Sequence, residues 1–270
     1  MRDLVPDTTR DVLWSPHAGI LRDWPPVRLF DAISKAGYVG TEIWMDPRWL
    51  DWRDPSDVRR IKGEAARRGL STPTICWRHF PEYAPTNPVT AKAGREYLLD
   101  SLRVGEAVGA TTVLIYPGVP QGVNYETAWQ TCREVVGSLE GECRARGMSI
   151  AIEFESPGPV LLGSPEDTIS FIRETGSHVS ACADTYHLYN RHREMREGVS
   201  RLKGHLTLVH LSDSGRQMPG KGQVDYPAFF EGLRDVGYRG PIFVQYDPVS
   251  EDEISLGLER SRKFAAVLDR

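Results

Sequence analysis

The sequence contains no pattern that would bind structural zinc or build a disulfide framework. Its four cysteines, Cys76, Cys132, Cys143 and Cys182, lie far apart and form no CxxC pair. Isolated cysteines of this kind are typical of buried thiols in a reducing compartment. The first eleven residues alternate in charge and contain no apolar core, so they do not resemble a secretory signal peptide. We therefore predict a cytoplasmic protein.

Two further absences narrow the choice of partners. No apolar run approaches the ~20 residues that a membrane-spanning helix needs. The net charge is −4, from 33 Lys and Arg against 37 Asp and Glu, so the chain has no excess of basic residues for binding nucleic acid. We expect neither a membrane nor a nucleic-acid partner. The 270 residues are 40% hydrophobic and 26% charged, which suits one large core.

A repeated pattern organises the chain. Seven times a helix-like segment ends at a glycine, and a β-branched run begins one to three residues later. A glycine at this position readily adopts the left-handed conformation that stops a helix. These glycines are Gly37, Gly69, Gly109, Gly147, Gly176, Gly204 and Gly237. With a first strand near residues 12–14, the pattern predicts eight strands.

Apolar residues at helical spacing fill the intervals between the strands. Three of the predicted helices begin with an N-cap residue followed by proline, at Asp54-Pro55, Asn87-Pro88 and Ser164-Pro165. The predicted helices span residues 25–36, 55–68, 88–108, 125–146, 165–175, 191–203, 226–236 and 251–268. Regular alternation of strands and helices predicts a single (β/α)8 TIM barrel over residues 1–270. The alternative, an open doubly wound sheet, is disfavoured because no GxGxxG follows the first strand.

In such a barrel the C-terminal ends of the strands carry the chemistry. Polar and aromatic residues stand at these ends, and we take seven of them as candidates for substrate binding: Trp14, His17, Glu42, Trp77, His79, Tyr116 and Glu155. The aromatic side chains, with Trp44, would form an apolar wall for a sugar or cyclitol ring. Alternatively, some of them fill gaps between the barrel and its helices.

Four other residues fall at the ends of four successive strands: Glu153, Asp184, His210 and Gln245. Two carboxylates, an imidazole and a carboxamide oxygen form a ligand set that suits a divalent cation and leaves positions for substrate oxygens. We expect Mn2+, with Mg2+ or Co2+ as alternatives. Because we expect no cysteine in the set, a structural zinc site is not expected.

Several motifs resemble the sugar isomerase/epimerase superfamily with the xylose isomerase-like TIM barrel. They are AIE at 151–153, DTYH at 184–187, VHLSDSGRQMPGKGQVDY at 209–226 and GYRGPIFVQ at 237–245. The middle two are similar to the DTFH and HxxDxxRxxPGxGxxD patterns of the ketose 3-epimerase and hydroxypyruvate isomerase branches, and GTEIW at 40–44 matches less closely. The resemblance covers nearly the whole chain. It implies a metal held by Glu153, Asp184, His210 and the residue of the last strand, with His187 and Arg216 contacting substrate oxygens.

The last strand departs from that pattern. Where the resembling epimerases and isomerases have a glutamate that binds metal and moves a proton, this chain has Gln245. A carboxamide can bind a cation through its oxygen but accepts no proton at neutral pH. Glu155 has the strand parity of Glu153, and Asp247 that of Gln245, so either is a candidate for the missing base. The alternative is that both form salt bridges in loops.

The resulting hypothesis is a metal-dependent isomerase or epimerase of a sugar or related polyhydroxy carbonyl compound. Glu153 would remove a proton next to the carbonyl, and the metal would stabilise the enediolate. A single competent base favours same-face aldose–ketose isomerisation, or β-elimination as in a dehydratase of a cyclitol or a dehydroshikimate-like compound. No phosphate-binding loop is present, so we expect an unphosphorylated substrate. The sequence leaves open whether the chain forms a homo-oligomer.

Two alternatives of other classes were weighed. A non-catalytic metal- or sugar-binding relative would explain Gln245, but such a protein would not require the other ligands and Arg216 to be intact. A nuclease of the endonuclease IV type would need more histidines at the strand ends and a basic face, which this acidic chain lacks.

Overall fold

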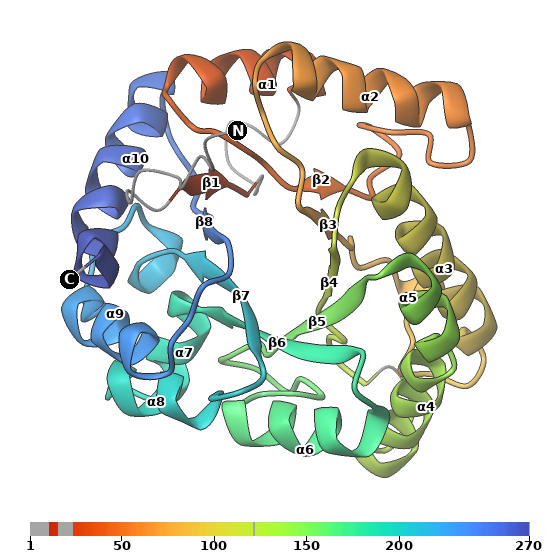
Figure 1. Cartoon of the computed structure of the whole chain (residues 1–270). Helices are drawn as coiled ribbons and strands as arrows, with labels where there is room; N and C mark the ends of the chain where they lie inside the picture. Colours follow the sequence, from red (N-terminus) through yellow and green to blue (C-terminus); the bar gives the residue numbers. More distant parts are fainter. Residues whose placement is uncertain (1–10, 16–23, 121, 270) are drawn as a thin grey trace, which may run out of the picture.

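The computed structural model describes residues 11–15, 24–120 and 122–269, so His17 lies outside the described residues. Eight parallel strands form one sheet in the order β1-β8-β7-β6-β5-β4-β3-β2. The bridge between Trp14 and Thr41 joins β1 to the segment before β2 and closes the ring seen in Figure 1. The strands are β1 (Val12–Trp14), β2 (Ile43–Trp44), β3 (Thr74–Cys76), β4 (Thr112–Ile115), β5 (Ser149–Glu153), β6 (Val179–Asp184), β7 (Leu206–Leu211) and β8 (Ile242–Val244). The predicted (β/α)8 barrel is confirmed.

Helices surround the ring of strands (Figure 1). They are α1 (Pro26–Lys35), α2 (Pro55–Arg67), α3 (Ala91–Val108), α4 (Tyr125–Gly137), α5 (Glu140–Arg146), α6 (Pro165–Thr175), α7 (Thr185–Arg191), α8 (Met195–Arg201), α9 (Tyr226–Asp235) and α10 (Glu251–Ala265), with short 3-10 turns η2 (Pro81–Tyr83), η3 (Ser214–Arg216) and η4 (Ala266–Asp269). In the described part of the chain, no helix combines the length and apolarity that a bilayer crossing requires.

The predicted helix starts hold at two of three positions. Asp54 caps α2 by accepting a hydrogen bond from the Ser56 amide, and Ser164 caps α6 by accepting one from the Asp167 amide. The start predicted at Asn87-Pro88 is wrong. The Asn87 side chain accepts from the amide of Val89, only two residues on, so it closes a turn, and α3 begins at Ala91.

One predicted helix is two helices in the structure: the predicted helix 125–146 breaks after Gly137, so α4 and α5 follow one another. The predicted helix 191–203 corresponds to the shorter α8. The chain also contains a helix that was not predicted, α7, which Asp184 caps directly at the end of β6 and which ends before His192. One predicted stop also differs: Gly176 ends α6 with φ 146° and ψ 170°, which is not a left-handed helical conformation.

Side chains of the strands alternate between two apolar cores. One set points outward and packs under the helices, as Val12 and Trp14 do. The other set fills the inside of the barrel. This inner layer consists of Leu13, Cys76, Leu114, Ala151, Cys182, Leu208 and Phe243. It closes the barrel beneath the strand ends, and all four cysteines are buried free thiols, as predicted.

Candidate active site

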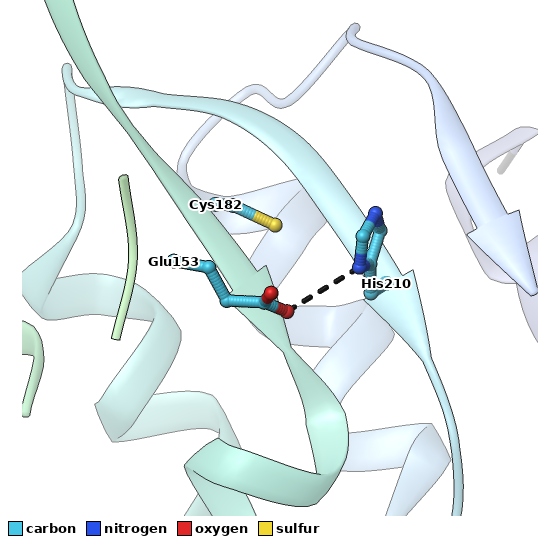
Figure 2. Close-up of side chains that lie close together, drawn as sticks. All are labelled: Glu153, Cys182 and His210. Atoms are coloured by element: carbon cyan, nitrogen blue, oxygen red, sulfur yellow. Dashed lines mark ion pairs between the residues drawn. The ribbon is translucent and has the colours of Figure 1, made fainter. Parts of the chain in front are cut away.

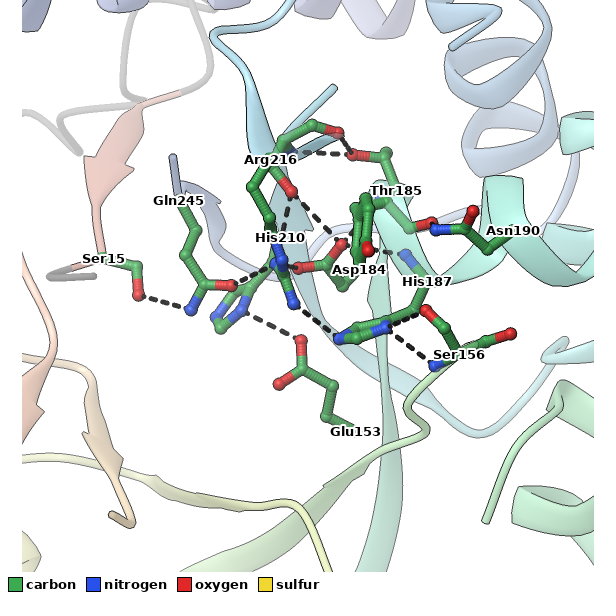
Figure 3. Close-up of polar contacts among 12 residues, drawn as sticks. Ser15, Glu153, Ser156, Asp184, Thr185, His187, Asn190, His210, Arg216 and Gln245 are labelled. Atoms are coloured by element: carbon green, nitrogen blue, oxygen red, sulfur yellow. Dashed lines mark hydrogen bonds and ion pairs between the residues drawn. The ribbon is translucent and has the colours of Figure 1, made fainter. Parts of the chain in front are cut away.

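The residues two positions after the inner layer on five strands are polar. On β1, β5, β6, β7 and β8 they are Ser15, Glu153, Asp184, His210 and Gln245, and none is more than 5% exposed. Asp184 and His210 face each other across the β6–β7 pair in the strand register. The four residues predicted as metal ligands therefore lie together above the inner layer, as Figure 3 shows.

His210 lies between two carboxylates. Its Nε2 is 3.1 Å from Glu42 Oε1, with a hydrogen bond, and its Nδ1 is 3.3 Å from Glu153 Oε1. Burial alone would lower the pKa of His210, but the carboxylates of Glu42 and Glu153 raise it well above its ordinary value. Although Nδ1 and Glu153 Oε1 form a close pair, they do not meet with hydrogen-bond geometry, and both atoms are buried without a hydrogen-bond partner.

Asp184 accepts contacts from three sides. Its Oδ1 accepts hydrogen bonds from the amides of Tyr186, at 2.7 Å, and His187, at 3.3 Å, and its Oδ2 lies 2.6 Å from Arg216 Nη1. Burial would raise the pKa of Asp184, but Arg216 and, next, His187 lower it to about 2. This carboxylate is therefore ionised throughout the physiological range, as a cation ligand must be.

The loop after β7 returns Arg216 to the centre. Asp213 is fully buried and accepts hydrogen bonds from the amides of Ser214, Gly220 and Val224, so it ties both ends of the loop to one carboxylate. Arg216 adopts φ +59°, an uncommon conformation for a residue with a side chain. This arrangement gives a physical reason for the spacing HxxDxxRxxPGxGxxD. The aspartate, Asp213, fixes the conformation of the loop, and that conformation brings the arginine, Arg216, into contact with Asp184.

The ring of His187 lies between Arg216 and the backbone of Ser156. Arg216 Nη2 lies 2.6 Å from His187 Nε2, and a guanidinium can only donate, so Nε2 must be the unprotonated nitrogen. On the other side of the ring, Nδ1 lies 2.8 Å from both the carbonyl oxygen and the amide nitrogen of Ser156, so a proton on Nδ1 suits the carbonyl whereas a bare Nδ1 suits the amide. Burial lowers the pKa of His187, which agrees with a neutral ring.

A cavity of about 190 Å³ lies over these groups. It is lined by Trp44, Cys76, Tyr116, Glu153, Glu155, His187, Arg216 and Gln245. Glu155 is half-buried, and burial, reinforced by the charge of Glu153, raises its pKa to about 7. The cavity thus combines aromatic walls with two carboxyl groups, an imidazole and a guanidinium, which can form hydrogen bonds with a polar ligand.

Two groups of three side chains could hold a divalent cation, and Glu153 belongs to both. Ligand atoms of Glu153, Asp184 and His187 lie within 4.8 Å of one another, and so do those of Glu153, Cys182 and His210 (Figure 2). Among the described residues, no group of this kind contains both Asp184 and His210. Glu153 Oε1 and His210 Nδ1, which lie 3.3 Å apart and have no hydrogen-bond partner, are the buried atoms that a bound cation would satisfy. Cys182 does not suit the role, because burial raises the pKa of its thiol well above the ordinary value.

Three of the other substrate-binding candidates lie near or in the cavity. Tyr116 and Glu155 line it. Half-buried His79 packs edge-on against Trp77, and its backbone amide donates to the Tyr116 hydroxyl. The remaining described candidates occupy other places. Trp77 is fully buried against Tyr97 and Tyr116. Trp14 packs edge-on against Tyr38 and Tyr246, between the barrel and its helices.

Glu42 is fully buried beneath His210, and its second oxygen accepts a hydrogen bond from Ser15. Ser15 and the backbone of Ser156 belong to the site and were missed by sequence reasoning. The strand period of two would have placed Ser15 beside Leu13 on the inner face, but no motif points to Ser156.

Fold and site together define a (β/α)8-barrel enzyme with a polar, cation-compatible centre at the C-terminal ends of its strands. Comparison with known proteins agrees. The family model described as "Xylose isomerase-like TIM barrel" matches residues 30–264, and the chain belongs to that family.

Its relatives act on sugars. The chain is 39% identical over 237 residues to an L-ribulose 3-epimerase of Methylomonas sp. (strain DH-1), covering 82% of this chain and 79% of the relative. It is 24% identical over 193 residues to a ketose 3-epimerase of Arthrobacter globiformis, covering 69% and 67%. The D-psicose 3-epimerase structure with D-tagatose from Clostridium cellulolyticum H10 superposes with a TM-score of 0.79 at 15% identity, covering 96% of both chains. This is therefore an enzyme of the sugar epimerase and isomerase kind, as the sequence motifs predicted.

Proposed function

We propose that this enzyme is a divalent-metal-dependent epimerase or isomerase of an unphosphorylated ketose or a closely related polyhydroxy ketone. The observation that carries the proposal is that two buried ligand atoms, Glu153 Oε1 and His210 Nδ1, lie 3.3 Å apart without a hydrogen-bond partner, beside the ionised carboxylate of Asp184 and under the polar cavity. The names of the relatives support the ketose as substrate class.

Glu153, Asp184 and His210 would hold the cation, with the oxygen of Gln245 as a neutral fourth ligand. Mn2+ is the expected ion, with Mg2+ or Co2+ as alternatives. A bound cation would supply Lewis-acid stabilisation of the negative charge that develops on the substrate oxygens. With two carboxylates instead of three, the site binds the cation less tightly than a site with a third carboxylate.

The chain's own residues handle the proton. Glu153 would remove the proton from the carbon next to the carbonyl. The second carboxyl group inside the cavity is Glu155, on the next inward-facing position after Glu153, so it is our candidate to return a proton. Of the two alternatives for a second base, Asp247 is not among the residues that line this cavity. Arg216 and His187, which also line the cavity, would hold substrate oxygens.

The two carboxyl groups in the cavity, Glu153 and Glu155, favour epimerisation or isomerisation over a binding function. A protein that only binds a ligand has no need for a second carboxyl group, Glu155, whose partial burial disfavours its ionised form. β-Elimination from a cyclitol or dehydroshikimate-like substrate remains the second candidate, because it needs one base and one acid and Glu153 and Glu155 can supply both.

The test is turnover in deuterium oxide. Purified protein, loaded with Mn2+, is incubated with L-ribulose, D-psicose and D-fructose, and products are separated and weighed by mass spectrometry. Epimerisation or isomerisation gives products of unchanged composition with one deuterium incorporated, whereas elimination gives loss of water. Glu153→Gln is expected to abolish both, while Glu134→Gln, an exposed glutamate on α4, is the matched control. Failure of every substrate to exchange or react, in protein shown to contain Mn2+, would contradict the proposal.

A further inference from the structure

A buried line of hydrogen bonds connects His210 to Gln245 through Glu42 and Ser15. His210 Nε2 meets Glu42 Oε1 at 3.1 Å, the Ser15 hydroxyl meets Glu42 Oε2, and Gln245 Nε2 meets Ser15 Oγ at 3.1 Å. Glu42, Ser15 and His210 are fully buried, and Gln245 is 5% exposed. We call these four residues the buried line. It links two of the proposed metal ligands and contains one carboxylate, which comes from the segment just before β2.

The chemistry of these groups fixes the direction of every hydrogen bond in the buried line. A carboxylate can only accept, so the single hydroxyl proton of Ser15 goes to Glu42. Ser15 Oγ then has only lone pairs left and must accept from Gln245. The amide of Gln245 therefore turns its NH2 toward Ser15. Its oxygen consequently faces Arg216 Nη1, at 3.0 Å, on the side of the proposed metal ligands (Figure 3).

The orientation of a glutamine amide is normally ambiguous, because its oxygen and nitrogen have similar shapes. Here the two neighbours of the Gln245 amide, Arg216 on one side and Ser15 on the other, remove the ambiguity. Arg216 offers only N–H groups and requires an oxygen, and Ser15 offers only lone pairs and requires an N–H group. A carboxamide satisfies both neighbours at once. A carboxylate at position 245 would satisfy Arg216 but would set two acceptors against the single proton of Ser15.

We propose that Ser15 and Glu42 are positioning residues that select a carboxamide at position 245 and hold its oxygen toward the cation. The inference rests on the proposed metal-dependent function. Gln245 is then a matched part of the centre rather than a lost glutamate. The carboxylate of Glu42 reaches the centre through the ring of His210 and not through direct contact with the cation.

A simpler role for Glu42 would be to orient the ring of His210, as carboxylates commonly do for histidine ligands. The two roles differ in one respect. If Glu42 acts on His210 alone, a substitution at position 245 changes the Mn2+ affinity by the same factor whichever residue is at position 42. If the buried line acts as a unit, the two positions are coupled through Ser15.

Exchanging the two groups tests the coupling. In the double variant Glu42→Gln/Gln245→Glu every hydrogen bond of the buried line can form again with its direction reversed at Ser15. The new amide at position 42 accepts from His210 and donates to Ser15, whose proton then goes to the new carboxylate at position 245. Each single variant instead leaves one partner unsatisfied. The net charge of the centre is the same in the double variant and in the wild type.

The measurement is Mn2+ affinity by titration calorimetry, without substrate, on the wild type, both single variants and the double variant. We expect the double variant to bind Mn2+ at least about ten-fold more tightly than the sum of the two single effects would give, which is a strongly non-additive cycle. This comparison removes the direct effect that the charge of each substitution has on Mn2+ binding. Effects of the two changes that simply add would overturn the proposal.

Ser15→Ala provides the internal check. With the hydroxyl removed, the coupling between positions 42 and 245 is expected to fall to the level of experimental error. Ser101→Ala is the matched control, because Ser101 is equally buried and donates to the Tyr97 carbonyl at 2.9 Å within α3. Should Glu42→Gln fail to fold, comparing Gln245→Glu with and without Ser15→Ala tests the same coupling, and equal affinities there would reject it.

The two proposals fail in different ways. A wild-type protein that binds no Mn2+, Mg2+ or Co2+ removes both the proposed function and this inference. Wild-type binding with an additive cycle removes only the inference.

Discussion

Arg216 Nη1 lies 2.6 Å from Asp184 Oδ2, and the same nitrogen is 3.0 Å from Gln245 Oε1. One guanidinium thus holds two of the four proposed metal ligands, while its Nη2 holds His187. Its carbon lies 4.5 Å from the centre of the Tyr186 ring, which covers its flat face. The arginine predicted to contact substrate therefore also organises the ligands beneath it.

Arg216→Lys is expected to reduce kcat/KM by about a hundred-fold or more, although the charge is kept. A lysine has one nitrogen and cannot bond Asp184, Gln245 and His187 from a planar fork. Steady-state kinetics checks the result. Arg196→Lys, on an exposed ion pair with Glu231 and Asp235, is the matched control and should leave kcat/KM unchanged. An active Arg216→Lys enzyme would show that the fork geometry is dispensable.

Asp184 is expected to make the metal-free protein sensitive to acid. Its folded pKa of about 2 is below the ordinary 3.8, so the ionised form stabilises the fold above pH 3.8. That contribution, on the order of 2 kcal/mol, is lost as the pH falls from about 4 to about 2. Urea unfolding at a series of pH values should show it in the wild type. Asp184→Asn should flatten the curve over this range, and an unchanged slope would contradict the assignment.

Asp213→Asn is expected to loosen the loop that carries Arg216. The substitution replaces one of two buried oxygens that accept the amides of Ser214, Gly220 and Val224. The loss of such an acceptor costs about 1–3 kcal/mol. We expect a lower Tm, a raised KM and faster hydrogen exchange in residues 212–224. Asp225→Asn is the control, because that residue caps α9 at its exposed surface through the Ala228 amide. Equal exchange in the two variants would argue against Asp213 as the organiser.

Glu155→Gln is expected to leave removal of the substrate proton intact but to block the return of a proton to the substrate. If Glu153 removes the proton and Glu155 returns one, the variant still washes tritium or deuterium out of the substrate but forms little product. The ratio of exchange to product, measured by mass spectrometry, should rise at least ten-fold over wild type. A variant that forms product normally would return Glu155 to the role of a substrate-binding group.

Much of the centre was predictable because it depends on strand order and strand parity. The spacing of glycines and β-branched runs predicted the eight strands, and the residues at the ends of β5 to β8 converge as expected. The alternation of side chains along each strand would have been enough to show which of the tryptophans face away from the cavity. Trp14 follows Leu13 and Trp77 follows Cys76, and both of those neighbours face inward, so both indoles must face outward.

Other features depend on geometry that a sequence pattern does not encode. Nothing in the pattern around Ser156 indicates that its backbone contacts the ring of His187. The short helix α7 was missed because its cap is Asp184, a residue read as a ligand and not as a helix start. The role of Asp213 likewise depends on three amides brought together by the fold of the loop.

The inner layer of Leu13, Leu114, Leu208, Phe243 and their neighbours has a kinetic consequence. Since apolar side chains plug the barrel below the polar centre, a cation and a sugar would enter and leave by the same upper route. Bound sugar would then shield the cation from chelators, and inactivation by EDTA should slow in proportion to substrate saturation.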